Sequence, residues 1–219
     1  MKNLFTLAIA SIVLLGSSFV SFGQDQRARF GVKLGGGVTW MNNSSIAEPR
    51  ATFNPVVGFG AQFGHRSRPV TLSTELFYSR KGSKLEYNIP NTYIGESRVN
   101  IHYLELPVYA NFRLSRTARF HVGGYGNVVL GSNQLNYGTF YNDAQGARDG
   151  DMSKFDYGVM GGLGLDFNKF KFDVRYTHGL NPIGESEQAK TYYGNGTMGT
   201  VEFSITKYIS PRSQRRGRR

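Results

Sequence analysis

The sequence predicts an all-β fold, an eight-stranded antiparallel up-and-down transmembrane β-barrel. Apolar and polar residues alternate with a period of two along eight separate segments, which is the pattern of strands with two different faces. Glycine and aromatic residues are abundant, with 28 Gly, 16 Phe and 13 Tyr in 219 residues, as in many antiparallel barrels. The connections between segments alternate between long and short, as in membrane barrels with long external loops and short periplasmic turns.

The N-terminal residues have the three parts of an export signal. A positively charged start, an apolar run over 4–20 and small residues at Ser21 and Gly23 fit a signal peptide. A membrane-anchoring helix is the alternative, although the run is barely long enough to span a bilayer. We therefore expect a signal peptide at 1–23 and one β-barrel domain over 24–209. The sequence has no cysteine, which excludes disulfides, thiolate nucleophiles and Cys-ligated metals.

Each predicted strand is a segment in which the alternation is continuous. The eight strands are Arg29–Trp40, Phe53–Gly64, Val70–Lys81, Arg98–Leu114, Phe120–Leu130, Phe155–Phe167, Phe170–Leu180 and Gly196–Ile209. The four predicted long loops are Met41–Thr52, Gly82–Ser97, Gly131–Lys154 and Asn181–Asn195. An even number of strands places both chain ends on one side, the periplasmic side, and allows the sheet to close. Closure is required because the unpaired backbone groups of a sheet edge cannot face hydrocarbon.

Alternation alone does not show which face meets lipid. Aromatic residues fall at both ends of the apolar face, as at the two interfaces of a membrane. The other face mixes glycine with charges of both signs, as in a narrow lumen filled by paired side chains. Both observations favour a barrel in the cell outer membrane over a soluble secreted barrel with its apolar face inside.

Five charged residues on the polar face form the predicted lumen charge network. They are Lys33, Glu75, Glu105, Arg113 and Arg175. Buried charges must pair, so the structural interpretation is a set of ion pairs that fills the barrel and fixes the strand register. The functional interpretation is a gate or a small polar pocket.

Two arginines, Arg80 and Arg98, flank one predicted hairpin near the external rim. A guanidinium can bind a phosphate in bidentate fashion, so lipopolysaccharide contact is one interpretation and solvated arginines are the other. The four histidines are scattered without metal-ligand spacing, and Gly35-Gly36-Gly37 is followed by no helix and is no phosphate loop. We expect no catalytic, metal or cofactor site.

The C-terminal residues 210–219 are rich in arginine and are expected to form a basic periplasmic tail. Because an exported protein does not meet nucleic acid, anionic lipid headgroups or an acidic periplasmic partner are the expected counterparts, and a solvated tail is the alternative. The expected partners are outer-membrane lipids, with lipopolysaccharide or a periplasmic partner of the basic tail as further candidates, and we expect a monomer.

Several short motifs in order resemble a known family. They are Phe30-Gly31-Val32-Lys33-Leu34-Gly35-Gly36-Gly37, Tyr103-Leu104-Glu105-Leu106-Pro107, Phe155-Asp156-Tyr157-Gly158, Gly161-Gly162-Leu163-Gly164 and Arg175-Tyr176-Thr177-His178-Gly179-Leu180. Together with a signal peptide that ends at Gly23-Gln24, they look like the PorT-type outer-membrane β-barrel proteins of Bacteroidetes. The resemblance implies an outer-membrane barrel. The namesake of the family takes part in type IX secretion and gliding.

The sequence therefore predicts an integral outer-membrane protein with a structural or interaction role and no catalysis. Three alternatives remain at this level. They are an accessory component of type IX secretion, a narrow channel, and a soluble ligand-binding barrel.

Overall fold

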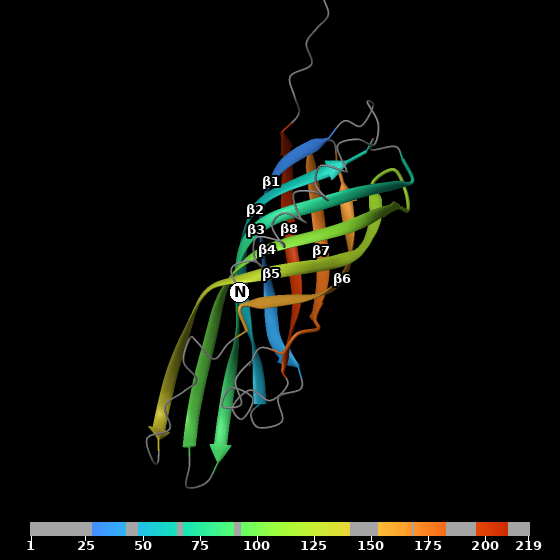
Figure 1. The fold of residues 1–219 in the computed structure, drawn as a ribbon. Helices are drawn as coiled ribbons and strands as arrows, with labels where there is room; N and C mark the ends of the chain where they lie inside the picture. Colours follow the sequence, from blue (N-terminus) through green and yellow to red (C-terminus); the bar gives the residue numbers. More distant parts are fainter. Residues whose placement is uncertain are drawn as a thin grey trace, which may run out of the picture.

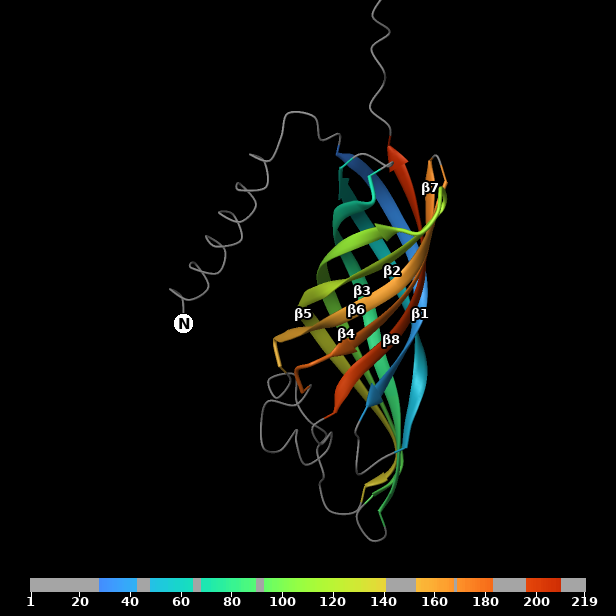
Figure 2. The ribbon, with the colours of Figure 1, turned by 90° about the vertical axis from the view of Figure 1, so that its right-hand side faces the viewer.

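The computed structural model describes residues 28–42, 48–64, 68–89, 93–140, 153–167, 169–182 and 196–209. They form eight strands: β1 (Arg29–Asn42), β2 (Glu48–Phe63), β3 (Val70–Ile89), β4 (Tyr93–Arg113), β5 (Ala118–Phe140), β6 (Phe155–Asp166), β7 (Phe170–Gly179) and β8 (Thr197–Ile209). Each strand pairs with the next in antiparallel fashion, and β8 pairs with β1 to close the barrel (Figures 1 and 2). The predicted fold class is confirmed. The expected signal peptide and basic tail lie outside the described residues.

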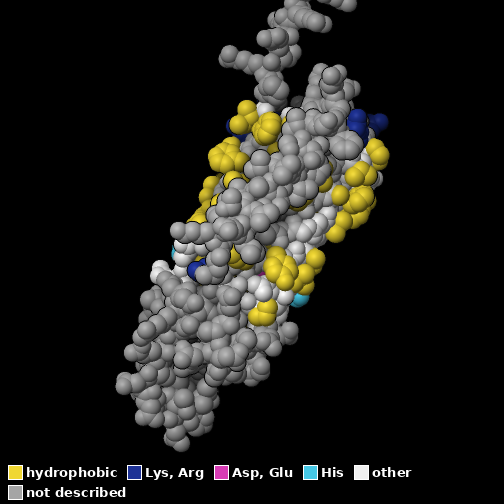
Figure 3. Space-filling model, viewed as in Figure 1, with side chains coloured by type: hydrophobic (Ala, Val, Ile, Leu, Met, Phe, Trp, Pro, Cys, Tyr) yellow, Lys and Arg dark blue, Asp and Glu magenta, His cyan; other side chains and the backbone are white. Residues whose placement is uncertain are grey.

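The period-two pattern of the strands gives the closed sheet an apolar outer face and a polar inner face. Leu34 of β1 lies opposite Val57 of β2 and Ile205 of β8, so one apolar row runs around the outside. Leu34 is 66% exposed and Leu163 is 61% exposed, whereas Lys33 is 0% exposed. Figure 3 shows the hydrophobic side chains on the outside of the barrel, with Lys and Arg at its upper end. The alternative of a soluble barrel with an apolar interior is wrong.

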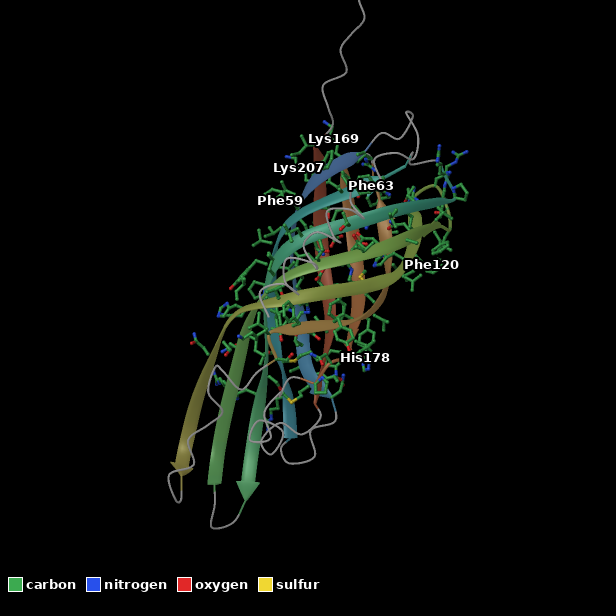
Figure 4. All side chains as sticks on the ribbon, in the orientation of Figure 1. Phe59, Phe63, Phe120, Lys169, His178 and Lys207 are labelled. Atoms are coloured by element: carbon green, nitrogen blue, oxygen red, sulfur yellow. The ribbon has the colours of Figure 1, made fainter. Side chains whose placement is uncertain are left out.

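The outward aromatic residues gather toward both ends of this apolar surface. Near the end of the barrel that carries the short connections, Phe112 stacks on Phe120 with ring centroids 4.7 Å apart. Toward the opposite end, Trp40 stacks on Tyr176 at 6.2 Å, and His178 lies nearby (Figure 4). Aromatic rings at these two levels mark the membrane interfaces. None of the described residues forms a helix that is long and apolar enough to cross a membrane.

Three strands continue well past the others at one end of the barrel. β3 and β4 pair as far as Ile89 with Tyr93, and β4 pairs with β5 as far as Phe140. They form a sheet that projects beyond the barrel (Figures 1 and 2), which we call the projecting sheet. The structure thus corrects the predicted loops Gly82–Ser97 and Gly131–Lys154, because most of the first and the start of the second are strand. We call this end the loop end, and the end with the short connections the turn end.

Glycines on the inner face allow neighbouring strands to pack closely. A Cβ atom built on Gly123 would lie 2.2 Å from the carbonyl oxygen of Val108, and one built on Gly58 would lie 2.3 Å from that of Leu76. Both distances are far below any van der Waals contact. These two glycines leave space for the large inward side chains of Tyr109 and Phe77, which are 3% exposed each.

Candidate functional site

The centre of the lumen holds four charged side chains and one tyrosine from five strands, which we call the central cluster. Glu75 of β3 accepts hydrogen bonds from Lys33 of β1 at 2.6 Å and from both terminal nitrogens of Arg175 of β7 at 2.9 and 3.0 Å. Lys33 also pairs with Glu202 of β8 at 2.6 Å. The hydroxyl of Tyr109 on β4 donates a further hydrogen bond to Glu75. The carboxylate of Glu75 on β3 therefore links side chains of β1, β4 and β7.

Aromatic rings complete the central cluster. The ammonium group of Lys33 lies 4.2 Å from the centroid of the Phe77 ring. The guanidinium of Arg175 lies 4.8 Å from the centroid of Tyr109. Such cation–π contacts strengthen when they are shielded from water. Two aromatic rings therefore lie against the cations of the cluster, whose side chains are buried.

Lys171, Asp173 and His121 border the central cluster on β7 and β5. Lys171 pairs with Asp173 at 2.9 Å and donates to the Tyr109 hydroxyl at 3.2 Å. The ring nitrogen Nδ1 of His121 lies 3.5 Å from the carboxylate of Asp173. All three side chains are almost fully buried, so the packing of the lumen continues without a break across β4, β5 and β7.

A second cluster lies nearer the loop end. Glu105 of β4 accepts hydrogen bonds from Lys81 of β3 at 2.8 Å and from the hydroxyl of Ser79. The Lys81 ammonium lies 5.5 Å and 5.2 Å from the ring centroids of Tyr103 and Tyr125. We call this group the loop-end cluster; it is separate from the ion pairs of Glu75.

A third cluster closes the turn end. Arg119 of β5 donates to Asp166 of β6 at 3.1 Å, and Arg29 of β1 pairs with the same carboxylate at 3.5 Å. Arg29 also donates to Gln62 at 3.3 Å, and its guanidinium lies 3.8 Å from the Tyr208 ring. Charged and aromatic side chains therefore fill the lumen at three levels.

The structure brings together three of the five residues predicted for the lumen network, namely Lys33, Glu75 and Arg175. Glu105 is buried in the lumen as well, but it belongs to the loop-end cluster. The prediction was wrong for Arg113, which is exposed at the turn end and donates to the carbonyl of Ser115 at 3.0 Å. It is the last residue of β4, where the strand leaves the barrel and the side chain meets solvent.

Several lumen residues were absent from the predicted network. Glu202 and Lys171 lie on the predicted polar faces of their strands, and their alternation with Phe203 and Phe172 could have identified them as partners. Lys81 follows Glu75 by six residues and therefore faces the same side. Tyr109 carries no formal charge, and alternation gives no sign of its hydrogen bond to Glu75.

The two arginines predicted to lie near the external rim, Arg80 and Arg98, are both exposed near the loop end. Arg80 lies opposite His102, and Arg98 lies opposite Lys84. The structure thus places both on the projecting sheet, at or beyond the edge of the apolar surface.

The lumen has the chemistry of a plug. Glu75, Glu105, Asp166, Asp173 and Glu202 each have a basic group within about 3 Å, and Asp156 accepts a hydrogen bond from Asn127 at 3.0 Å. The largest fully buried side chains include Arg175, Lys33 and Lys171. A narrow eight-stranded barrel has room for side chains but not for a water column. The paired and buried side chains of the lumen therefore make the barrel rigid.

The chain is similar to known outer-membrane proteins. The profile of the outer membrane protein beta-barrel domain family matches residues 22–185. Among solved structures, the neisserial surface protein A is 12% identical, with 84% of this chain and 99% of that chain covered and a TM-score of 0.51. Ail, the attachment invasion locus protein of Yersinia pestis, crystallised with the heparin analogue sucrose octasulfate, is 9% identical with the same coverage and a TM-score of 0.46. No curated protein sequence matches this chain. At these identities the structural similarity shows the fold alone.

Proposed function

The chain belongs to the outer membrane protein beta-barrel domain family, and from this premise we propose that it is a sealed outer-membrane anchor whose projecting sheet binds a protein partner outside the cell. The partner adds an extended strand to the free edge of β5. The short connections and both strand ends Arg29 and Ile209 face the periplasm, as is usual in bacterial barrels.

The observation that carries the proposal is the unequal pairing of β5. On one side β4 pairs with β5 over its full length to Phe140. On the other side β6 pairs only with Ala118–Val128. Within the described part of the chain, the backbone of Asn133–Phe140 therefore has a strand neighbour on one side only. An unpaired strand edge presents N–H and C=O groups on which a second extended chain can form hydrogen bonds.

The sequence of this edge favours strand addition. Folded proteins usually protect an exposed edge with charged residues or proline. The segment Asn133–Phe140 contains neither, and reads Asn-Gln-Leu-Asn-Tyr-Gly-Thr-Phe. Uncharged segments without proline and with aromatic residues pair readily with other strands. The edge thus combines open backbone groups with a sequence that does not repel a partner.

The lumen supports the anchor role of the barrel. Buried ion pairs lie at three levels of the lumen, and those of Glu75 join the non-neighbouring strands β1, β3 and β7. A pore would need a continuous path of water past Arg175, Lys33 and Tyr109. We therefore rank the interaction role above a narrow channel.

The secretion alternative stays a hypothesis. The PorT-type resemblance would connect this chain with type IX secretion in Bacteroidetes, and the basic segment 210–219 would contact lipid headgroups or an acidic periplasmic partner. No feature of the described residues favours this role over the interaction role. A deletion strain with an unchanged profile of secreted proteins would count against it.

Strand addition can be tested with a peptide that copies residues 133–140, because antiparallel pairing of two identical strands is geometrically allowed. The peptide is added to the purified barrel in detergent, and hydrogen–deuterium exchange is measured along β5. We expect slower exchange in 133–140 and unchanged exchange in the barrel segment 118–128. A scrambled peptide of the same composition is the control for nonspecific binding.

Two proline variants make the test specific. In adjacent residues of an edge strand, one N–H points to the paired strand and the next points to the open side. One of Asn136→Pro and Tyr137→Pro should therefore abolish peptide binding while β4–β5 pairing persists, and the other should disrupt that pairing. If saturating peptide leaves exchange in 133–140 unchanged in the unmodified protein, strand addition is refuted.

A further inference from the structure

We propose that a groove on the outer surface of β1, β6, β7 and β8 binds one anionic phospholipid from the membrane leaflet at the turn end. Lys207 of β8 binds the phosphate of the headgroup, and the groove holds an acyl chain. The free edge of β5 takes no part in this binding, so the inference does not depend on strand addition.

The groove is a hollow in the apolar surface of the barrel. It encloses about 990 Å³, a volume typical of small-molecule sites. Gly36 of β1 forms part of its floor because this outward position has no side chain. Phe53 of β2 borders the groove on one side, and Leu163 and Leu165 of β6 border it on the other. A groove with these apolar walls, on the surface that faces lipid, accepts a hydrocarbon chain.

The strand register shows where the groove lies on the barrel wall. Two rows of outward cross-strand partners on β1, β8 and β7 line it. The next row toward the turn end consists of Val32, Lys207 and Phe170. The ammonium group of Lys207 therefore stands at the end of the groove that is nearest the turns. The two lining rows are Leu34, Ile205 and Phe172, and Gly36, Phe203 and Val174.

Lys207 is an exception on this surface. Among the described residues it is the one lysine, arginine, aspartate or glutamate on the outer faces of β1, β6, β7 and β8. It is exposed, and both of its cross-strand partners are apolar. Ile209, the last residue of β8, is the next outward residue. A lysine so close to the strand end reaches the headgroup level with its ammonium group while its methylene stem lies on the apolar surface.

Lys169 supplies a second cation at the same end of the barrel. Its carbonyl oxygen accepts a hydrogen bond from the backbone N–H of Tyr208 at 2.8 Å, so its backbone lies beside the residue that follows Lys207. Lys169 is exposed as well, and both lysines lie at the turn end (Figure 4). Two neighbouring cations favour a headgroup with a net negative charge, because the cation of a zwitterionic headgroup is repelled.

The length of the groove matches one leaflet of the membrane. On β1 it extends to Val38, which is six residues from Val32, the partner of Lys207. Six residues span about 20 Å along a strand, and a strand tilt of about 40° reduces this to roughly 15 Å across the membrane. The hydrocarbon core is about 30 Å thick. A phospholipid with its phosphate at Lys207 therefore has its acyl chain along the groove as far as the middle of the bilayer.

The test is a titration of the purified full barrel in detergent with phosphatidylglycerol, which is anionic, and with phosphatidylcholine, which is zwitterionic. Native mass spectrometry counts the bound lipids and the copies of the chain. Lys207→Gln removes the headgroup contact, and Lys207→Arg keeps the charge. Gly36→Val places a side chain in the floor of the groove, where its Cβ atom would lie 2.6 Å from the tip of the Phe53 ring and displace that ring.

Two matched controls lie on β5 or beside it, away from the groove. Arg116→Gln removes an exposed charge from the turn between β4 and β5. Gly126→Val changes an outward glycine of β5 that has nothing within 4 Å of its Cβ position. The shift of the band on boiling verifies that each protein is folded.

We expect the unmodified protein to bind one phosphatidylglycerol more tightly than phosphatidylcholine. In Lys207→Gln the dissociation constant for phosphatidylglycerol should rise about tenfold, since a lost hydrogen bond to a charged group weakens binding by that factor. Lys207→Arg and both controls should bind like the unmodified protein, and Gly36→Val should weaken the binding of both lipids. The proposal is overturned if Lys207→Gln binds phosphatidylglycerol as tightly as Arg116→Gln, if Gly36→Val binds like Gly126→Val, or if the unmodified protein is a lipid-free dimer that Gly36→Val dissociates.

Discussion

Replacement of Glu75 by glutamine tests whether the central cluster holds the barrel walls together. The carboxylate accepts four hydrogen bonds, one from Lys33, two from Arg175 and one from Tyr109. Glutamine has nearly the same shape but carries no charge and offers one acceptor oxygen. Lys33 keeps its second partner, Glu202, at 2.6 Å, whereas both hydrogen bonds from Arg175 to Glu75 are lost or weakened.

The expected cost follows from this geometry. Removal of one partner of a buried ion pair destabilises a protein by about 3–5 kcal/mol. Because Lys33 retains Glu202 and the amide can accept one hydrogen bond, we expect the low end, about 3 kcal/mol. This corresponds to roughly a 100-fold fall in the ratio of folded to unfolded protein.

The assay is reversible urea unfolding of the barrel in lipid vesicles, followed by fluorescence of Trp40. Trp40 is the one tryptophan of the sequence, and it lies in the aromatic level near the loop end. The double variant Glu75→Met/Arg175→Met removes both charges, so it should lose less stability than Glu75→Gln alone. Arg113→Gln, at an exposed position, should change the free energy of unfolding by less than about 0.5 kcal/mol.

Two results would refute this reasoning. The first is a Glu75→Gln variant whose free energy of unfolding lies within about 1 kcal/mol of the unmodified protein. The second is a double variant that is less stable than the single one, since the two charges would then not depend on each other.

Three further predictions concern the lumen, the glycines and the lipid face. Planar bilayers should show no conductance for the unmodified protein or for Glu105→Ala, because the central cluster remains in place; steady single-channel steps would contradict this. Gly58→Ala should prevent folding or cost more than about 2 kcal/mol, as measured by the boiling-dependent gel shift, whereas Gly126→Ala, with nothing within 4 Å of its Cβ position, should be neutral. Val174→Arg, midway along β7, should cost about 2–4 kcal/mol and Val70→Arg, at the turn end, about 0–1 kcal/mol. Equal losses in urea unfolding would contradict the assignment of the lipid face.

The sequence predicted the strands well wherever a strand crosses the membrane. In that region one side chain meets lipid and the next meets the lumen, so Leu34 and Lys33 differ sharply in polarity. The same rule placed Glu75 and Arg175 inside. It could not pair them, because contacts across the lumen depend on how far each strand is shifted along its neighbour.

The projecting sheet was missed for a physical reason. Beyond the membrane both faces of a strand meet water, so the period-two contrast disappears. The segment from Lys84 to Ile89 and the segment from Asn133 to Phe140 therefore resemble loops in sequence. Alternation also fails at the turn end. It assigns Arg113 to the lumen, although β4 ends at this residue and its side chain is exposed.

The balance of charge in the lumen has a consequence for voltage. Among the described residues, the acids of the three clusters and their neighbours are Glu75, Glu105, Asp156, Asp166, Asp173 and Glu202, and the bases are Arg29, Lys33, Lys81, Arg119, Lys171 and Arg175. Moving one elementary charge across a potential of 100 mV changes its energy by about 2.3 kcal/mol. The forces on the six cations and the six anions of the lumen are opposite and cancel. A potential difference between the two sides of the membrane therefore exerts little net pull on the interior, and the barrel should keep its shape when that potential changes.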